Sequence, residues 1–270
     1  MSSIRIVLRE LGLNIKSLIK WIIVLVLLIF ASHLLFDFLF IENEEFNHYL
    51  GLLPPIVLTL LNMSLEIDYS TAHGFLSFIF IYPTYLLVFA SGFAGTRLLT
   101  REQEDQSFEF LYSRPIPRIL ILFLKLLTGI LFCLIINLAV TLPLRHFFAD
   151  LGVDALITTY MQANLLLQIL ALSIGALISM FFRYADTAAQ YTGILLFAAV
   201  VFERVLVLAG DLGGSLWMLT LFSYFPPLEL VYGYSYGLPE AARNLTIALI
   251  VGINLLILLI HLRRDFRLNN

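Results

Sequence analysis

The chain has 270 residues, of which 60% are hydrophobic and 13% are charged, and its formal net charge is −3. Soluble globular proteins average about 45–50% apolar and about 25% charged residues. The composition therefore excludes an ordinary soluble domain and indicates an integral membrane protein. The slight acidity gives no sign of nucleic-acid binding. The single cysteine, Cys133, lies in an apolar run and rules out a disulfide within the chain.

The first 20 residues have the pattern of an amphipathic helix. Their apolar residues fall mostly on one helical face and alternate with Arg5, Arg9, Lys16 and Lys20. A cationic amphipathic helix is suited to lie in the membrane interface, so we predict an interfacial helix over residues 1–20. The alternative is an ordinary cytosolic lead-in to the first span.

Six apolar runs are long enough to cross a bilayer, which takes about 20 residues. The first run is too long for a signal-peptide core and has no convincing cleavage site, so we expect it to be retained. Pro83 predicts a kink in the second run. The predicted spans are residues 21–40, 73–95, 119–141, 155–182, 187–208 and 240–262.

Two of the connections between spans are themselves apolar. Residues 51–65 are too short and too interrupted by proline to cross the membrane, and we expect a short helix packed on the outer face. Residues 209–239 are rich in Gly, Pro and aromatic residues and include an apolar extracellular part suited to re-enter the bilayer. The sequence therefore predicts an all-α polytopic membrane protein with six transmembrane helices, in a single domain over residues 1–270.

The distribution of Lys and Arg predicts the orientation. With the N-terminus in the cytoplasm, 13 of the 16 Lys and Arg residues lie inside, and only Arg145, Arg204 and Arg243 lie outside. An excess of Lys and Arg in short loops marks the cytoplasmic side. We therefore predict a multi-pass protein of the cell membrane with both termini in the cytoplasm. The polar run at residues 100–118 is then cytoplasmic too.

That polar run is the longest one between two predicted spans, and its residues are ordered. Acidic residues come first, an apolar patch follows, and a proline-flanked basic end closes the run. A helix over residues 102–112 would be about 16 Å long at about 1.5 Å per residue. The helix dipole would favour the acidic residues at its N-terminal end, and Phe108, Leu111 and Tyr112 would form an apolar contact face. The alternative is a charged loop that only anchors the topology.

The run resembles the cytoplasmic segment of the type-2 ABC transporter permeases (ABC-2 type), the membrane subunits of ABC exporters. The residues that carry the resemblance are Glu102, Ser107, Phe108, Glu109, Leu111, Tyr112, Pro115 and Arg118. Lys125, early in the third span, and the ending Arg263-Arg264-Asp265 also resemble family features. Gln106 stands where the family usually has glycine, which bears on the local turn geometry.

The resemblance implies a permease subunit of an ATP-driven exporter, with a cytoplasmic coupling helix between its second and third spans. The sequence contains no phosphate loop of the form G-x-x-x-x-G-K-[ST]. We therefore expect ATP and Mg to be bound by a partner subunit, with no cofactor or enzyme activity in this chain. The implied partners are two ABC ATPase subunits, a second permease copy or a paralogue, and membrane lipid. The residues expected to couple to the ATPase are Glu102, Glu104, Asp105, Phe108, Glu109, Leu111, Tyr112, Arg114, Pro115 and Arg118.

Other ionisable groups in the apolar runs are weaker candidates. Glu203 and Arg204, near the outer end of the fifth span, are interpreted as interfacial, snorkelling side chains, or else as part of the outer mouth. Neighbouring residues on a helix point about 100° apart and need not pair. His33 and Asp37, spaced i, i+4, share a helical face, but this spacing is not diagnostic of a metal site.

Polar residues inside the spans are expected to form interhelical hydrogen bonds, with a translocation path as the alternative. They include Asn137, Asn164, Gln168, Gln190 and Asn254. Gly175 and Gly193 are weak indications of close helix packing. Two other functions remain open. One is a non-transporting membrane sensor or assembly factor, and the other is an intramembrane enzyme built on the ionisable groups of the first or fifth span.

Overall fold

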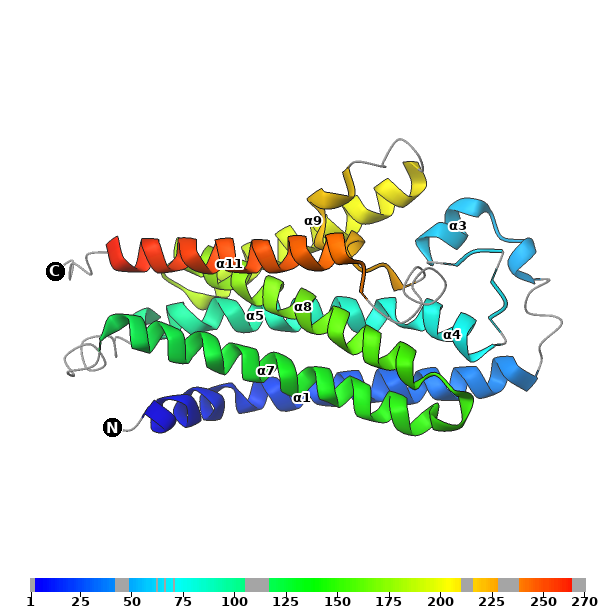
Figure 1. The fold of residues 1–270 in the computed structure, drawn as a ribbon, viewed down its shortest axis with the longest axis horizontal. Helices are drawn as coiled ribbons and strands as arrows, with labels where there is room; N and C mark the ends of the chain where they lie inside the picture. Colours follow the sequence, from blue (N-terminus) through cyan, green and yellow to red (C-terminus); the bar gives the residue numbers. More distant parts are fainter. Residues whose placement is uncertain are drawn as a thin grey trace.

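The computed structural model is helical throughout the long segments that it describes. The described residues are 3–41, 49–61, 63–65, 67–69, 71–104, 117–209, 216–227 and 238–263, and they include no strand. The long helices lie side by side in one bundle, with both chain termini at the same end (Figure 1). We call this the terminal end and the opposite end, where α3 and α4 lie, the distal end.

Six segments of the described chain are long and apolar enough to cross a membrane. They consist of α1 (Ser3–Ile41), α4 (Ala72–Ile79) together with α5 (Ile81–Glu104), α7 (Arg118–Phe147), α8 (Asp154–Ser179), α9 (Ala185–Ala209) and α11 (Glu240–Arg263). The predicted class, an all-α polytopic membrane protein with six spanning helices, is confirmed. The third span continues past residue 141 to Phe147, and the fourth ends at Ser179 rather than at residue 182.

Helix α1 has no end at the boundary predicted between residues 20 and 21. It runs without interruption for 39 residues, about 58 Å at about 1.5 Å per residue, which exceeds a hydrocarbon core of about 30 Å. The sequence of α1 contains no proline that would stop it. The predicted interfacial segment is therefore the first part of the same helix as the first span. Within it, Glu10 and Asn14 are buried, and the Asn14 side chain donates to the Glu10 carbonyl.

The second span is broken at Phe80, as Pro83 predicts. Proline has no N–H to donate to the carbonyl four residues earlier, here that of Ile79, and its ring crowds that carbonyl. Helix α4 accordingly ends at Ile79, and α5 begins at Ile81. The carbonyl of Phe80 accepts hydrogen bonds from the Thr84 hydroxyl (2.8 Å) and from the Tyr160 hydroxyl of α8 (2.9 Å). The Phe80 carbonyl at the break is thus satisfied inside the bundle, as an apolar environment requires.

Helices α5 and α8 form the central seam of the bundle, where their backbones nearly touch. A Cβ added to Gly95 of α5 would lie 2.2 Å from the Leu172 carbonyl oxygen of α8. A Cβ added to Gly175 of α8 would lie 2.1 Å from the Gly92 carbonyl oxygen of α5. Only glycine allows so close an approach. The expectation that Gly175 lies at a packing face is confirmed.

The distal end is covered by short elements. Helix α3 (Pro55–Leu60) is the short helix expected within residues 51–65, and it packs against α9. The turns η3 (Leu216–Leu219) and η4 (Leu221–Ser223) lie in the apolar connection that precedes α11. Phe222, Tyr224 and Phe225 pack in one buried cluster with residues of α5, α8, α9 and α11. The connection is therefore largely buried in protein from Thr220 to Pro227, whereas Leu216, Met218 and Leu219 of η3 are exposed.

Candidate functional site

The predicted coupling segment begins inside the second span rather than after it. Helix α5 continues through Glu102 and ends at Glu104, so the helix expected to start at residue 102 does not start there. The residues that follow Glu104 lie outside the described part of the chain, so the expected dipole stabilisation of these acidic residues stays a prediction. Their role in coupling stays a prediction.

The far end of the segment returns to the bundle at Arg118, the first residue of α7, directly after Pro117. The start of α7 and the end of α5 both lie at the terminal end of the bundle (Figure 1). The remaining predicted coupling residues lie outside the described part of the chain. They are Asp105, Phe108, Glu109, Leu111, Tyr112, Arg114 and Pro115.

Lys125 joins the two helices that flank this segment. It lies near the start of α7, and its side chain is buried. Its ammonium group donates a hydrogen bond to the carbonyl oxygen of Leu98 near the end of α5. A buried ammonium group needs such partners, because leaving it unpaired is costly. The contact therefore fixes α7 to α5 close to the point where α5 enters the predicted coupling segment.

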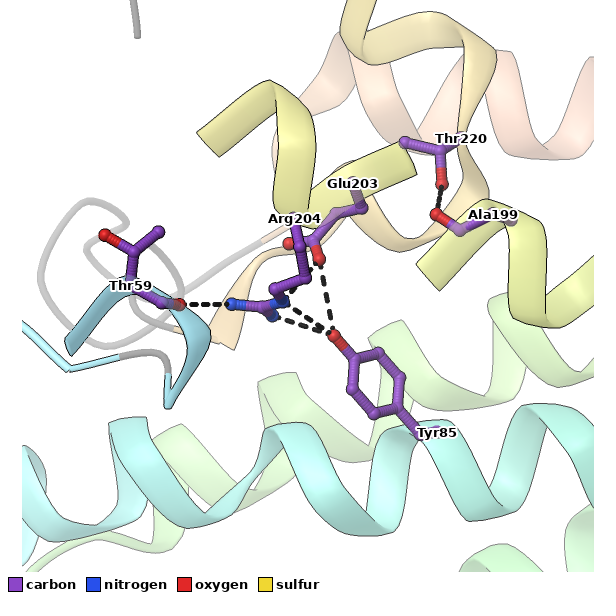
Figure 2. A network of polar contacts seen from close by, with 6 residues as sticks. All are labelled: Thr59, Tyr85, Ala199, Glu203, Arg204 and Thr220. Carbon is purple, nitrogen blue, oxygen red and sulfur yellow. Dashed lines mark hydrogen bonds and ion pairs between the residues drawn. The ribbon is translucent and has the colours of Figure 1, made fainter. Parts of the chain in front are cut away.

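A second polar cluster lies at the distal end of the bundle, around Arg204 of α9 (Figure 2). The side chains of Arg204 and Glu203 are only 10% and 6% exposed, and Arg204 Nε lies 2.8 Å from Glu203 Oε2. The interpretation as interfacial, snorkelling side chains is wrong, and the two residues, which need not have paired, do pair. The roughly 100° between neighbouring residues on a helix separates their Cβ directions, but both long side chains bend toward one point.

That point is the hydroxyl of Tyr85 on α5. It lies 3.1 Å from Arg204 Nε and 2.8 Å from Nη2, both of which donate to it, and it donates in turn to Glu203 Oε2 at 3.3 Å. Arg204 Nη1 donates to the carbonyl oxygen of Thr59, in the last turn of α3, at 3.2 Å (Figure 2). One guanidinium group therefore connects α9, α5 and α3.

The same cluster extends to the connection before α11. The Tyr85 ring packs edge-on against Phe222 of η4, with centroids 5.0 Å apart. The Thr220 hydroxyl donates to the Ala199 carbonyl of α9 at 2.9 Å (Figure 2). Tyr224, whose hydroxyl donates to the Met218 carbonyl, is buried, and this burial raises its pKa. We call Thr59, Tyr85, Glu203, Arg204 and Phe222 the distal cluster.

His33 and Asp37 approach each other, and no further ligand joins them among the residues that the structure describes. His33 Nε2 lies 3.8 Å from Asp37 Oδ2, and the imidazole stacks on Phe147 of α7 with centroids 4.6 Å apart. Among the described residues, no three His, Cys, Asp or Glu side chains are grouped closely enough to hold a metal ion. The pair is therefore best explained as part of the packing between α1 and α7.

The polar residues inside the spans fall into two groups. Asn137 donates to the Met161 carbonyl of α8, and Asn254 donates to the Ser173 hydroxyl, so both form the expected interhelical hydrogen bonds. Gln168 and Asn164 of α8 are buried, yet both amide atoms of Gln168 and the Asn164 Nδ2 have no partner among the described residues. Gln190 is exposed instead.

The helices and their contacts define a multi-pass, all-α membrane protein whose terminal and distal ends are each joined by buried polar side chains. The chain belongs to the ABC-2 family of transporter proteins, whose sequence model matches residues 4–263. It is accordingly a membrane permease of an ABC transporter, a transport subunit that is not itself catalytic. A search of curated proteins finds no match to the chain.

Proposed function

We propose that this permease is the membrane subunit of an exporter and that separate ATPase subunits drive it through residues 102–118. The observation that carries the proposal is the course of α5. From Ile81 onward, α5 continues without a break into Glu102 and Glu104, the first residues of the proposed docking surface. A force applied to that surface would act directly on a buried helix.

The packing around α5 supports this route. The glycine seam leaves no space between α5 and α8, so a displacement of α5 must also move α8. The hydrogen bond from Lys125 of α7 to the Leu98 carbonyl of α5 joins α7 to these two helices. Closure of an ATPase dimer would then move α5, α7 and α8 together and switch the membrane path between two orientations, as in rigid-body transitions generally.

The remaining parts of the proposal concern orientation and partners. The bias of Lys and Arg supports cytoplasmic termini in the cell membrane, which makes the terminal end cytoplasmic and the distal end outer. Both termini lie at one end of the bundle (Figure 1), as an even number of crossings requires. ATP and Mg would be bound by the two ATPase subunits, and a second permease copy or a paralogue would complete the membrane domain.

The proposal is tested by reversing one charge in the docking surface. We expect Arg114→Glu to insert into the membrane normally but to abolish cargo transport by the reconstituted complex with its ATPase. The matched control is Arg183→Glu, an exposed position in the turn between α8 and α9 that lies on the same predicted face of the membrane. Transport by Arg114→Glu equal to that by Arg183→Glu would show that residues 102–118 do not couple the two subunits.

A further inference from the structure

The distal cluster joins segments that are far apart in the sequence. Arg204 reaches Tyr85 and Thr59 across 119 and 145 positions of the chain. Its two partners lie in the second span and in the short helix α3, which lies over the distal end of α9. Removing this one guanidinium group would remove the hydrogen bonds that link α9 both to α3 and to the distal part of α5.

The chemistry of these contacts differs from that of the rest of the bundle. A buried ion pair contributes little net stability, because the cost of desolvating the two charges offsets most of their attraction. When such a contact opens to water, both charges regain their hydration. A polar cluster can therefore separate and re-form at low net cost, whereas the glycine seam between α5 and α8 has no comparable hydration to regain.

We propose that Arg204 is the positioning residue of an outer latch that keeps the distal end of the permease closed and that opens during transport. This inference rests on the proposed function for the identification of the distal end as the outer one. Glu203 neutralises the guanidinium group, the Tyr85 hydroxyl aligns it, and the Thr59 carbonyl near the C-terminus of α3 accepts from it, at a helix end that favours cations. Phe222 packs on the Tyr85 ring, so the connection before α11 would move when the latch opens.

The latch is tested by the accessibility of a probe beneath it. Ala242 of α11 is buried in the same cluster as Phe222, so Ala242→Cys places a small thiol under the outer connection. The native Cys133 is fully buried and provides a low background. The measured quantity is the rate at which a membrane-impermeant maleimide, added to the outer side of proteoliposomes that contain the permease alone, labels the thiol introduced by Ala242→Cys.

We expect Arg204→Met to raise this rate by about tenfold or more, because the closed state would then bury the Glu203 carboxylate without its counter-charge, which is costly. Tyr85→Phe removes only one hydroxyl and is expected to give a smaller increase, and Arg204→Lys an intermediate one. The control is Arg145→Met, which removes an exposed arginine of α7 that donates to the Thr158 hydroxyl and lies on the same predicted face of the membrane. Its rate should equal that of the parent.

An unchanged labelling rate in both Arg204→Met and Tyr85→Phe would overturn the latch. Tyr85→Phe keeps the inference testable if Arg204→Met does not fold. Because this assay contains no ATPase, its outcome is independent of the coupling proposal. Adding the ATPase subunits and ATP provides the separate readout: faster labelling of the parent supports coupling, and an unchanged rate contradicts coupling while leaving the latch result intact.

Discussion

The glycine seam between α5 and α8 and the distal cluster both involve α5, but they hold it in different ways. At the seam, backbone meets backbone, and the glycines at positions 95 and 175 leave no room for a Cβ. At the distal cluster, α5 is held by one tyrosine hydroxyl in contact with an arginine and a glutamate. The difference indicates a permanent contact in the middle of the bundle and a separable one at its distal end.

The largest expected effect is the loss of the seam. Gly175→Val places a branched side chain where even a Cβ would lie 2.1 Å from the Gly92 carbonyl oxygen. Overpacking typically costs about 1–3 kcal/mol and sometimes more. Because backbone rather than a flexible side chain is in the way, we expect no folded protein to be recovered. The measurement is the yield of monodisperse protein in detergent. Gly252→Val in α11, where nothing lies within 4 Å of an added Cβ, should be recovered normally.

Removing one charge of the distal cluster should lower the stability of the protein, whereas removing both charges should lower it much less. Glu203→Gln leaves the Arg204 guanidinium buried without its counter-charge, and breaking a buried pair costs about 3 kcal/mol or more. The double variant Glu203→Gln with Arg204→Met removes both charges and should recover most of that loss. The measurement is the unfolding free energy or melting temperature of the single and double variants in one detergent. If the loss of unfolding free energy in the double variant equals the sum of the losses in the two single variants, the two side chains act independently.

The smallest effects on stability are expected inside α7 and α8, where the loss of one buried amide should destabilise the bundle and the loss of another should not. Asn137→Leu removes an interhelical hydrogen bond and should destabilise the bundle by about 0.6 kcal/mol, up to about 1.7 kcal/mol. Gln168→Leu removes an amide that has no partner among the described residues, so it should be neutral or stabilising. Equal destabilisation by the two substitutions would mean that Gln168 has a partner of its own.

The positions of the spans could be predicted because hydropathy and proline act locally. Long apolar runs located all six spanning helices, and Pro83 located the break at Phe80 within the second. No helix end marks the predicted boundary at residue 20, because a charged amphipathic stretch and an apolar stretch can be parts of one helix when no proline or cap separates them. For the same reason Glu102 proved to be part of α5.

The distal cluster could not be predicted from the sequence. Because neighbouring side chains on a helix point in different directions, the sequence did not require Glu203 and Arg204 to pair. The group that contacts both of them, the Tyr85 hydroxyl, lies 119 residues from Arg204. A tyrosine near the proline-induced break of a span and an adjacent acid–base pair in another span were the only local signals. Neither specifies the other without tertiary packing.

The central claim is that motion enters at residues 102–118, passes along α5 and reaches the distal end. It is tested most directly by labelling Ala242→Cys from the outer side in the complete complex, with and without ATP. We predict that ATP speeds the labelling in the parent and that Arg114→Glu removes this ATP effect while the basal rate stays the same. An ATP effect of equal size in the parent and in Arg114→Glu would contradict the account.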